Sequence, residues 1–125
     1  MTDKKQVLII DDMEQNRKAI KTFLFFLHFD ATLAVDGLDA KKILESKHFD
    51  LIVSDIEMPN MNGFELLASV KKAPAHKDTP VIMLSTLDTP EVMERCKKLG
   101  AGSYIVKPFT KEKFESALTA LKLFP

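Results

Sequence analysis

The chain has 125 residues, close to the commonest size of a single domain and enough to bury a hydrophobic core. Lys plus Arg and Asp plus Glu number 18 each, so no overall attraction to nucleic acid or to an anionic membrane is expected. A single cysteine, Cys96, excludes an intramolecular disulfide and a cysteine-rich zinc site, and we expect its thiol to face the core.

Two further absences narrow the class of protein. No apolar run approaches the roughly 20 residues of a membrane span, and the start MTDKK does not resemble a signal peptide, so we expect a cytoplasmic protein. The histidines are scattered along the chain and predict no metal site; they are His28, His48 and His76.

Strand-like and helix-like segments alternate along the chain. Short apolar runs without polar alternation predict doubly buried strands of a parallel sheet at residues 6–10, 31–35, 50–55, 81–85 and 103–106. Helical spacing of apolar residues predicts helices at residues 13–28, 38–46, 62–72, 88–100 and 110–123. The alternation predicts an α/β fold, one domain over residues 1–125, with helices on both faces of the sheet.

Helix ends and helix faces can be predicted more finely. Asp12-x-x-Gln15 and Asp88-x-x-Glu91 have the spacing of capping boxes, and Gly100 suits a helix end.

On the helical wheels Met13 and Leu38 face the core. Phe25 points almost away from it, and Phe26 lies on the flank, where we expect it to pack at the helix margin.

Polar residues gather where the predicted strands end. The ligand site of an open α/β sheet lies at the carboxyl ends of its strands. There the chain places three carboxylates, two hydroxyls and an ammonium group, on Asp11, Asp12, Asp55, Ser85, Thr86 and Lys107. We therefore expect these side chains to share one edge of the sheet.

Three ionised carboxylates at this edge need a cation, or some of them must be protonated. Two like charges about 4 Å apart repel by roughly 4 kcal/mol at an effective dielectric near 20, and Lys107 supplies one positive charge. A site of few oxygen ligands favours Mg²⁺ over Ca²⁺. Beside Mg²⁺ a carboxylate such as Asp55 can attack phosphorus, while Lys107 and Ser85 are suitable donors to phosphoryl oxygens.

The chain resembles the response-regulator receiver domains, and most of all their CheY-like single-domain members. The resemblance rests on the segments VLIIDD, LIVSDIEMPNMNG, VIMLST and YIVKPF at residues 7–12, 51–63, 81–86 and 104–109. It implies a three-layer (βα)₅ doubly wound sheet with the flavodoxin-like strand order 2-1-3-4-5. It also implies a stand-alone switch of a two-component, possibly chemotactic, system, which a histidine kinase or phosphotransfer protein phosphorylates and which then dephosphorylates itself.

The resemblance also implies roles for single residues. Asp55 is the phosphoacceptor, and Asp12, Asp55 and the backbone carbonyl of Glu57 bind Mg²⁺, while Asp11 acts mainly through water. Lys107, joined to Pro108 by a cis bond, contacts the phosphoryl group. Ser85 and Tyr104 correspond to the switch residues. The fourth helix, fifth strand and fifth helix form the face that binds a downstream protein.

Two features depart from the family pattern. Glu57 adds a fourth carboxylate, which we expect to reach Lys107 or the cation and to alter hydrolysis. Phe25 and Phe26 stand where charge is usual in such domains. They form a docking patch, for self-association or a partner, or else Phe26 packs at the helix margin and Phe25 is a lone exposed aromatic. Thr86 is an alternative hydroxyl to Ser85, and the oligomeric state is a monomer or a weak dimer.

Three other functions remain open at this stage. Asp55-Ile-Glu57 loosely resembles the paired acids of aspartate-nucleophile phosphatases, although such pairs normally follow the first strand. A flavin or nucleotide module would need a phosphate loop after the first strand, where Asp11 and Asp12 repel phosphate. An unphosphorylated scaffold of the same fold is the third alternative.

Overall fold

The structure, a computed structural model, describes residues 4–123. The expectation that the start MTDKK is not a signal peptide rests in part on residues that lie outside this range. Strands and helices alternate in the order β1 (Lys5–Ile10), α1 (Glu14–Phe26), β2 (Phe29–Ala34), α2 (Gly37–Leu44), β3 (Leu51–Asp55), α3 (Gly63–Lys72), β4 (Val81–Ser85), α4 (Pro90–Lys98), β5 (Ser103–Val106) and α5 (Lys111–Ala120). None of the helices in the described range is long and apolar enough to cross a membrane.

The five strands form one parallel sheet in the order β2-β1-β3-β4-β5. The predicted fold class and strand order are therefore confirmed. Every residue of β3 and β4 is buried, which explains why neither run shows polar alternation.

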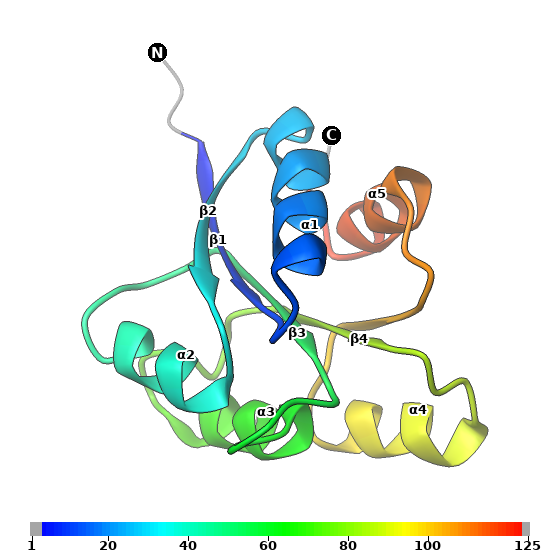
Figure 1. Cartoon of the computed structure of the whole chain (residues 1–125). Coiled ribbons are helices and arrows are strands. Elements are labelled where there is room, and N and C mark those ends of the chain that lie inside the picture. Colours follow the sequence, from blue (N-terminus) through cyan, green and yellow to red (C-terminus); the bar gives the residue numbers. More distant parts are fainter. Residues whose placement is uncertain (1–3, 124–125) are drawn as a thin grey trace.

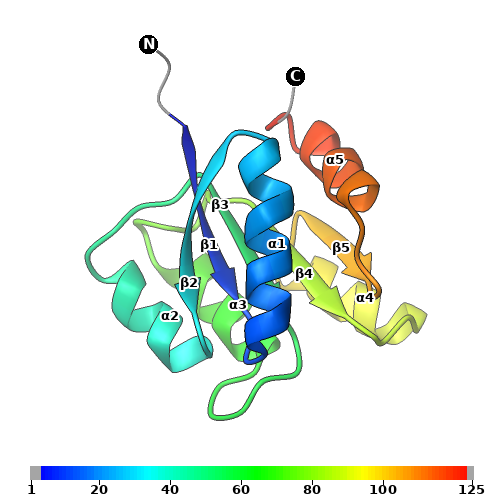
Figure 2. The ribbon, with the colours of Figure 1, turned by 45° about the horizontal axis from the view of Figure 1, so that its top comes forward.

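Helices cover the sheet on both faces. Helices α1 and α5 lie on one face, and α2, α3 and α4 lie on the other (Figures 1 and 2). Alternate residues of the strands supply two cores: Val7 and Ile9 pack with α1 and α5, whereas Leu8 and Ile10 pack under α2 and α3. With both faces covered, the strand ends are where polar side chains can gather.

The loop after β3 is held tightly against the sheet. Ile56 N donates to Leu84 O at 3.0 Å, and Gly63 N donates to Ile56 O at 2.8 Å. Asn62 then caps α3 in a reciprocal capping box with Glu65. These bonds fix the backbone on both sides of Asp55.

Both predicted capping boxes are wrong by one residue. Helix α1 has Met13 as its N-cap, without a side-chain cap, because the Asp12 carboxylate turns toward the other aspartates instead. Helix α4 is capped by Thr89, whose side chain accepts from Val92 N. Pro90 explains this shift, since proline suits the first helical position and the residue before it is then the cap. Gly100 ends the helix with a φ of 102°, as predicted.

Three predicted helix-face positions also differ from the structure. Leu38 is 51% exposed because α2 begins at Gly37 and buries the face formed by Gly37, Ala40 and Leu44. Met13 is exposed because it precedes α1. Phe26 does not pack at the helix margin but is more exposed than Phe25, at 63% against 52%. Cys96 is buried, as expected.

Gly63 allows the close approach of α3 to the end of β3. A Cβ at this position would lie 2.4 Å from the backbone oxygen of Asp55 and 2.7 Å from Ile56 Cα. We therefore expect Gly63→Ala to lower the free energy of unfolding by about 1–3 kcal/mol in urea titrations. Gly102→Ala is the matched control, because its nearest contact is the mobile end of Leu121 and a smaller loss is expected. Equal losses for the two variants would contradict this packing argument.

Candidate functional site

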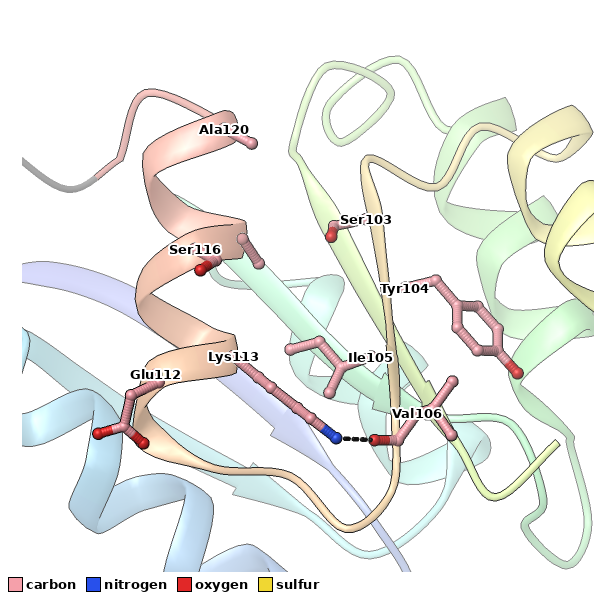
Figure 3. A pocket seen from close by; sticks show the side chains of 9 residues that line it. Ser103, Tyr104, Ile105, Val106, Glu112, Lys113, Ser116 and Ala120 are labelled. Atoms are coloured by element: carbon pink, nitrogen blue, oxygen red, sulfur yellow. Dashed lines mark hydrogen bonds between the residues drawn. The ribbon is translucent and has the colours of Figure 1, made fainter. Parts of the chain in front are cut away.

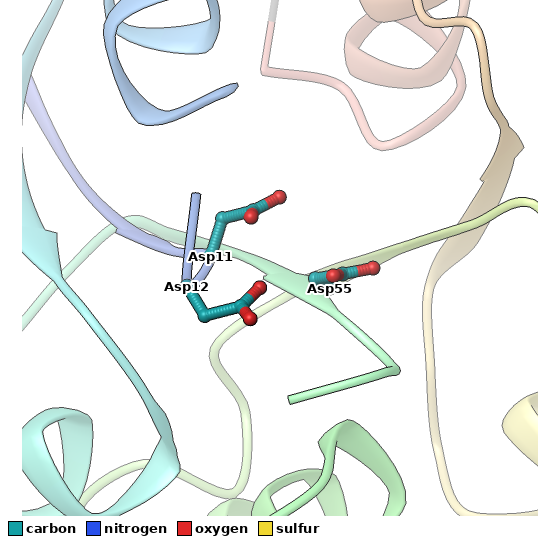
Figure 4. A group of neighbouring side chains, drawn as sticks. All are labelled: Asp11, Asp12 and Asp55. Carbon is teal, nitrogen blue, oxygen red and sulfur yellow. The ribbon is translucent and has the colours of Figure 1, made fainter. Parts of the chain in front are cut away.

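The carboxyl ends of the strands bring three aspartates together. Asp11 and Asp12 follow β1 directly, and Asp55 is the last residue of the neighbouring strand β3. One carboxylate oxygen from each lies within 4.8 Å of the others. Figure 4 shows the Asp11, Asp12 and Asp55 side chains turned toward the same side of the strand ends. The predicted convergence of these carboxylates is therefore present in the structure.

Asp11 is buried and held by several donors. Its carboxylate accepts from Met13 N at 2.9 Å and Asn16 Nδ2 at 3.2 Å, and Arg17 Nη1 donates to its backbone oxygen at 2.8 Å. Sequence reasoning missed Asn16 and Arg17 as supports of the site. The available signal was Asn16 itself, a polar residue on the otherwise apolar face of α1.

Asp12 differs from its two neighbours in being exposed. Across residues 4–123 no side chain forms an ion pair with it and no donor bonds its carboxylate. Its oxygens are thus free to bind a cation from solvent, whereas those of Asp11 are largely occupied. This difference supports a direct role for Asp12 and an indirect one for Asp11.

Lys107 joins the two buried aspartates. Its Nζ lies 3.2 Å from Asp55 Oδ1 and 3.5 Å from Asp11 Oδ2. It follows β5 and precedes Pro108, and the bond between them is cis, as the family resemblance implied. One ammonium group cannot neutralise three carboxylates, so the site retains a net negative charge.

The pKa of Asp55 reflects first its burial and then these neighbouring charges. Asp55 is only 4% exposed, and this burial raises the pKa of its carboxyl to about 6. Lys107 opposes this rise, whereas the nearby charge of Asp11 adds to it. At neutral pH Asp55 is mostly ionised, and its ionised form is destabilised while no cation is bound.

Ser85 and Thr86 lie at the end of β4 and both contact Glu57. Each hydroxyl donates to Glu57 Oε1, at 3.3 Å in both cases. Of the two expected partners of Glu57, Lys107 is not contacted, because its ammonium group lies between Asp11 and Asp55, whereas a contact with the cation stays a prediction. Glu57 instead holds the hydroxyl predicted to serve the phosphoryl group.

Tyr104 is joined to the same loop from β5. Its hydroxyl donates to the backbone oxygen of Leu87, and Leu87 N in turn donates to Ser85 Oγ at 3.0 Å. Partial burial raises the pKa of the Tyr104 hydroxyl. Ser85 and Tyr104 therefore hold the two sides of one residue of the β4–α4 loop.

The comparisons with known proteins decide the family. Residues 7–119 match the response regulator receiver domain. The chain belongs to this family. Protein PilG of Pseudomonas aeruginosa is 35% identical over 119 residues, which cover 95% of this chain and 88% of PilG. Chemotaxis protein CheY-3 of Vibrio cholerae is 36% identical over 121 residues, which cover 93% of each chain.

Solved structures agree with this assignment. The structure of Vibrio cholerae chemotaxis protein CheY4 superposes on this receiver domain with a TM-score of 0.87 at 34% identity. The match covers 93% of this chain and 97% of CheY4. As a member of this family, the chain has the phosphoacceptor role of two-component signalling.

The donor set of the receiver domain fits Mg²⁺. All three side-chain donors are carboxylates, one of them exposed, and hard oxygen ligands with room for water suit this ion. The acidic cluster lacks the histidine and cysteine ligands that zinc prefers. The fit concerns the aspartates; a contribution from the backbone carbonyl of Glu57 stays a prediction.

The predicted output face of the receiver domain carries an open pocket. It lies between β5 and α5, has a volume of about 540 Å³ and includes Tyr104, Val106 and Ser116 (Figure 3). Lys113 spans one end of it, with Nζ donating to Val106 O at 2.8 Å. The face therefore has a pocket lined in part by Tyr104, whose role as a switch residue stays a prediction.

The phenylalanine pair lies at the far end of α1 from the acidic edge. The rings of Phe25 and Phe26 contact each other with centroids 5.6 Å apart, and Lys4 Nζ lies 4.0 Å from the Phe25 centroid. Helix α1 separates this pair from Asp11 by about 18 Å of helical rise. A docking role for the pair stays a prediction.

The raised pKa of Asp55 gives a stability prediction. The pKa of an unfolded aspartate is about 3.9, so the metal-free folded state loses stability as the pH rises from about 4 through 6. We expect Asp55→Asn to raise the free energy of unfolding by roughly 1–3 kcal/mol at about pH 8 in EDTA, and the gain to shrink toward pH 4. Urea titrations of both proteins measure it. A variant no more stable than the wild type at pH 8 would contradict the raised pKa of Asp55 in the folded state.

Proposed function

We propose that this chain is a stand-alone response regulator in which Asp55 accepts a phosphoryl group with the help of Mg²⁺. One observation carries the proposal: a nearly buried carboxylate lies 3.2 Å from Lys107, within a cluster of three aspartates. A histidine kinase or a histidine phosphotransfer protein would donate the group.

The nucleophile is the Asp55 oxygen that other contacts leave free. Asp55 Oδ1 accepts from Ile56 N at 3.0 Å and pairs with Lys107, whereas Oδ2 has no such contact in the described part of the chain. Oδ2 attacks phosphorus, the bond from phosphorus to the donor's imidazole nitrogen breaks, and that nitrogen retains the electron pair. The product is an acyl phosphate, which attack by water later returns to carboxylate and inorganic phosphate.

Asp12 and Asp55 would hold the cation, with Asp11 in support. A bound Mg²⁺ supplies positive charge that offsets repulsion between the carboxylates and the incoming phosphoryl oxygens. Lys107 adds an ammonium donor on the side of Asp11 and Asp55. The fixed position of Lys107 between two carboxylates means that little reorganisation is needed when the phosphoryl group arrives.

Ser85 links the chemistry to the output face. A serine hydroxyl has one proton, so it donates either to Glu57 or to a phosphoryl oxygen. Moving that donor alters the Ser85–Leu87–Tyr104 chain of hydrogen bonds and thereby the β4–α4 loop. The phosphorylated state would then present a different surface on α4, β5 and α5 to a protein target.

The names of two relatives suggest the setting. CheY-3 and CheY4 of Vibrio cholerae are chemotaxis proteins, and both match this chain over more than nine tenths of its length. We therefore place the proposed switch in the cytoplasm, in a pathway of this kind. The domain carries out its own phosphorylation and dephosphorylation and acts on its target by binding, without turning over an external substrate.

The chemistry can be tested by intact mass spectrometry. We expect the wild type to gain one phosphoryl group when it is incubated with a small acyl-phosphate donor and Mg²⁺, and Asp55→Asn to gain none. EDTA should prevent the gain, because the carboxylates then remain uncompensated. Wild-type protein that binds Mg²⁺ but remains unmodified would favour the scaffold alternative, and release of many phosphate equivalents from a small ester would favour a phosphatase.

We propose that Glu57 shortens the lifetime of the acyl phosphate on Asp55. Its carboxylate competes for the Ser85 proton and adds negative charge beside the phosphoryl group. We expect Glu57→Asn to lengthen the lifetime of the acyl phosphate about fivefold, since one hydrogen bond contributes about 1 kcal/mol. Glu94→Gln is the control, because it removes an exposed carboxylate from α4. Phosphate release followed over time measures the lifetime, and an unchanged rate in Glu57→Asn would rule out this role.

A further inference from the structure

Two histidines that are far apart in the sequence meet at the opposite edge of the sheet from the aspartates. His48 lies in the loop between α2 and β3, and His76 lies in the loop between α3 and β4. Their ring centroids are 5.3 Å apart and their planes are inclined by 48°. The histidines are scattered along the sequence, and their spacing therefore predicted no metal site. The fold nevertheless brings two of them into contact.

The tautomer of His76 follows from the one hydrogen bond that its ring forms. Its Nε2 lies 2.7 Å from the backbone oxygen of Leu44. A carbonyl oxygen only accepts, so Nε2 carries the proton and the lone pair of the neutral ring is on Nδ1. The histidine is only 7% exposed, and Nδ1 is the single buried side-chain nitrogen or oxygen without a partner among residues 4–123.

This pattern is the one found in histidines that bind metals. A ligating histidine almost always donates its second ring nitrogen to a carbonyl or carboxylate, which fixes the ring and directs the free lone pair at the metal. His76 has the carbonyl partner and the free lone pair. An orphaned acceptor in a buried position costs stability, and a bound cation would remove that cost.

The distance between the rings also suits a shared ion. With Zn–N bonds of about 2.0–2.1 Å in tetrahedral geometry, the centres of two bound imidazoles lie roughly 5 Å apart. The observed 5.3 Å is close to this value. Imidazole nitrogen selects zinc and similar transition metals over Mg²⁺, which distinguishes this pair from the aspartate cluster.

We propose that His48 and His76 form a two-imidazole site for Zn²⁺ or a closely similar divalent transition metal. The three aspartates are the only cluster of three or more acidic, histidine or cysteine ligands in the described chain, so water completes the coordination at the histidines. The site is therefore reversible rather than a permanent structural centre. A bound ion would join the α2–β3 loop to the α3–β4 loop, and it would stabilise the folded state.

The test is a titration of metal-stripped protein with Zn²⁺ in excess Mg²⁺, which keeps the aspartates occupied. Isothermal calorimetry should show one Zn²⁺ per chain, and Zn²⁺ should raise the melting temperature. His48→Gln should weaken binding at least tenfold and remove the rise, because it takes away one of two protein ligands. His48 is exposed, so this variant is expected to keep the fold.

His28→Asn is the matched control. His28 is exposed at the end of α1 with a φ of 72°, a conformation that asparagine also tolerates, and this variant should bind Zn²⁺ like the wild type. In nitrogen-detected NMR, Zn²⁺ should shift the Nδ1 resonance of His76. Equal affinity in the wild type and His48→Gln, or an unchanged Nδ1 resonance at saturating Zn²⁺, would overturn the proposal.

Discussion

The repulsion between carboxylates at the ends of β1 and β3 is the constraint on which the rest of this receiver domain depends. Asp11 and Asp55 are buried with Asp12 beside them, and Lys107 provides one compensating charge. Hydrophobic burial of the parallel sheet holds these groups together even though they repel. Burial, opposed by Lys107 and reinforced by the charge of Asp11, raises the pKa of Asp55, and a cation bound at the three carboxylates would offset the cost of ionising it.

In the proposed switch, the other residues of this edge would convert phosphorylation of Asp55 into a change of the surface on α4, β5 and α5. Ser85 has a single proton and two competing acceptors, Glu57 in this structure and a phosphoryl oxygen in the proposed product. Leu87 connects Ser85 to Tyr104, which lies beside the pocket of the β5–α5 surface. In the proposed switch, a displacement of the Ser85 hydroxyl would therefore extend to the face that binds the target. The balance between the two acceptors would then set how much of the protein is switched at a given level of phosphorylation.

The fold and the position of the acidic site could be predicted from the sequence, because both depend on strong periodic patterns of apolar residues. Doubly buried strands must be apolar, so the sheet and the position of its carboxyl edge follow from the sequence. The predictions that were wrong concern positions where neighbouring residues compete for the same role, such as a helix cap. Asp12 has the spacing of a helix cap but turns to the aspartate cluster, and Pro90 moves a helix start by one residue. The partners of Glu57 and the meeting of His48 with His76 depend on loop paths, which no local pattern encodes.

Identifying the modified residue tests the central claim most directly. Protein phosphorylated in the presence of Mg²⁺ can be reduced with borohydride, which converts an acyl phosphate into an alcohol and leaves free carboxylates intact. Peptide mapping by mass spectrometry then locates the alcohol. The charge and contact pattern of the site predicts it at Asp55, the one aspartate of the cluster that pairs with Lys107 through one oxygen and keeps the other free. An alcohol at Asp11 or Asp12, with Asp55 unmodified, would contradict the account.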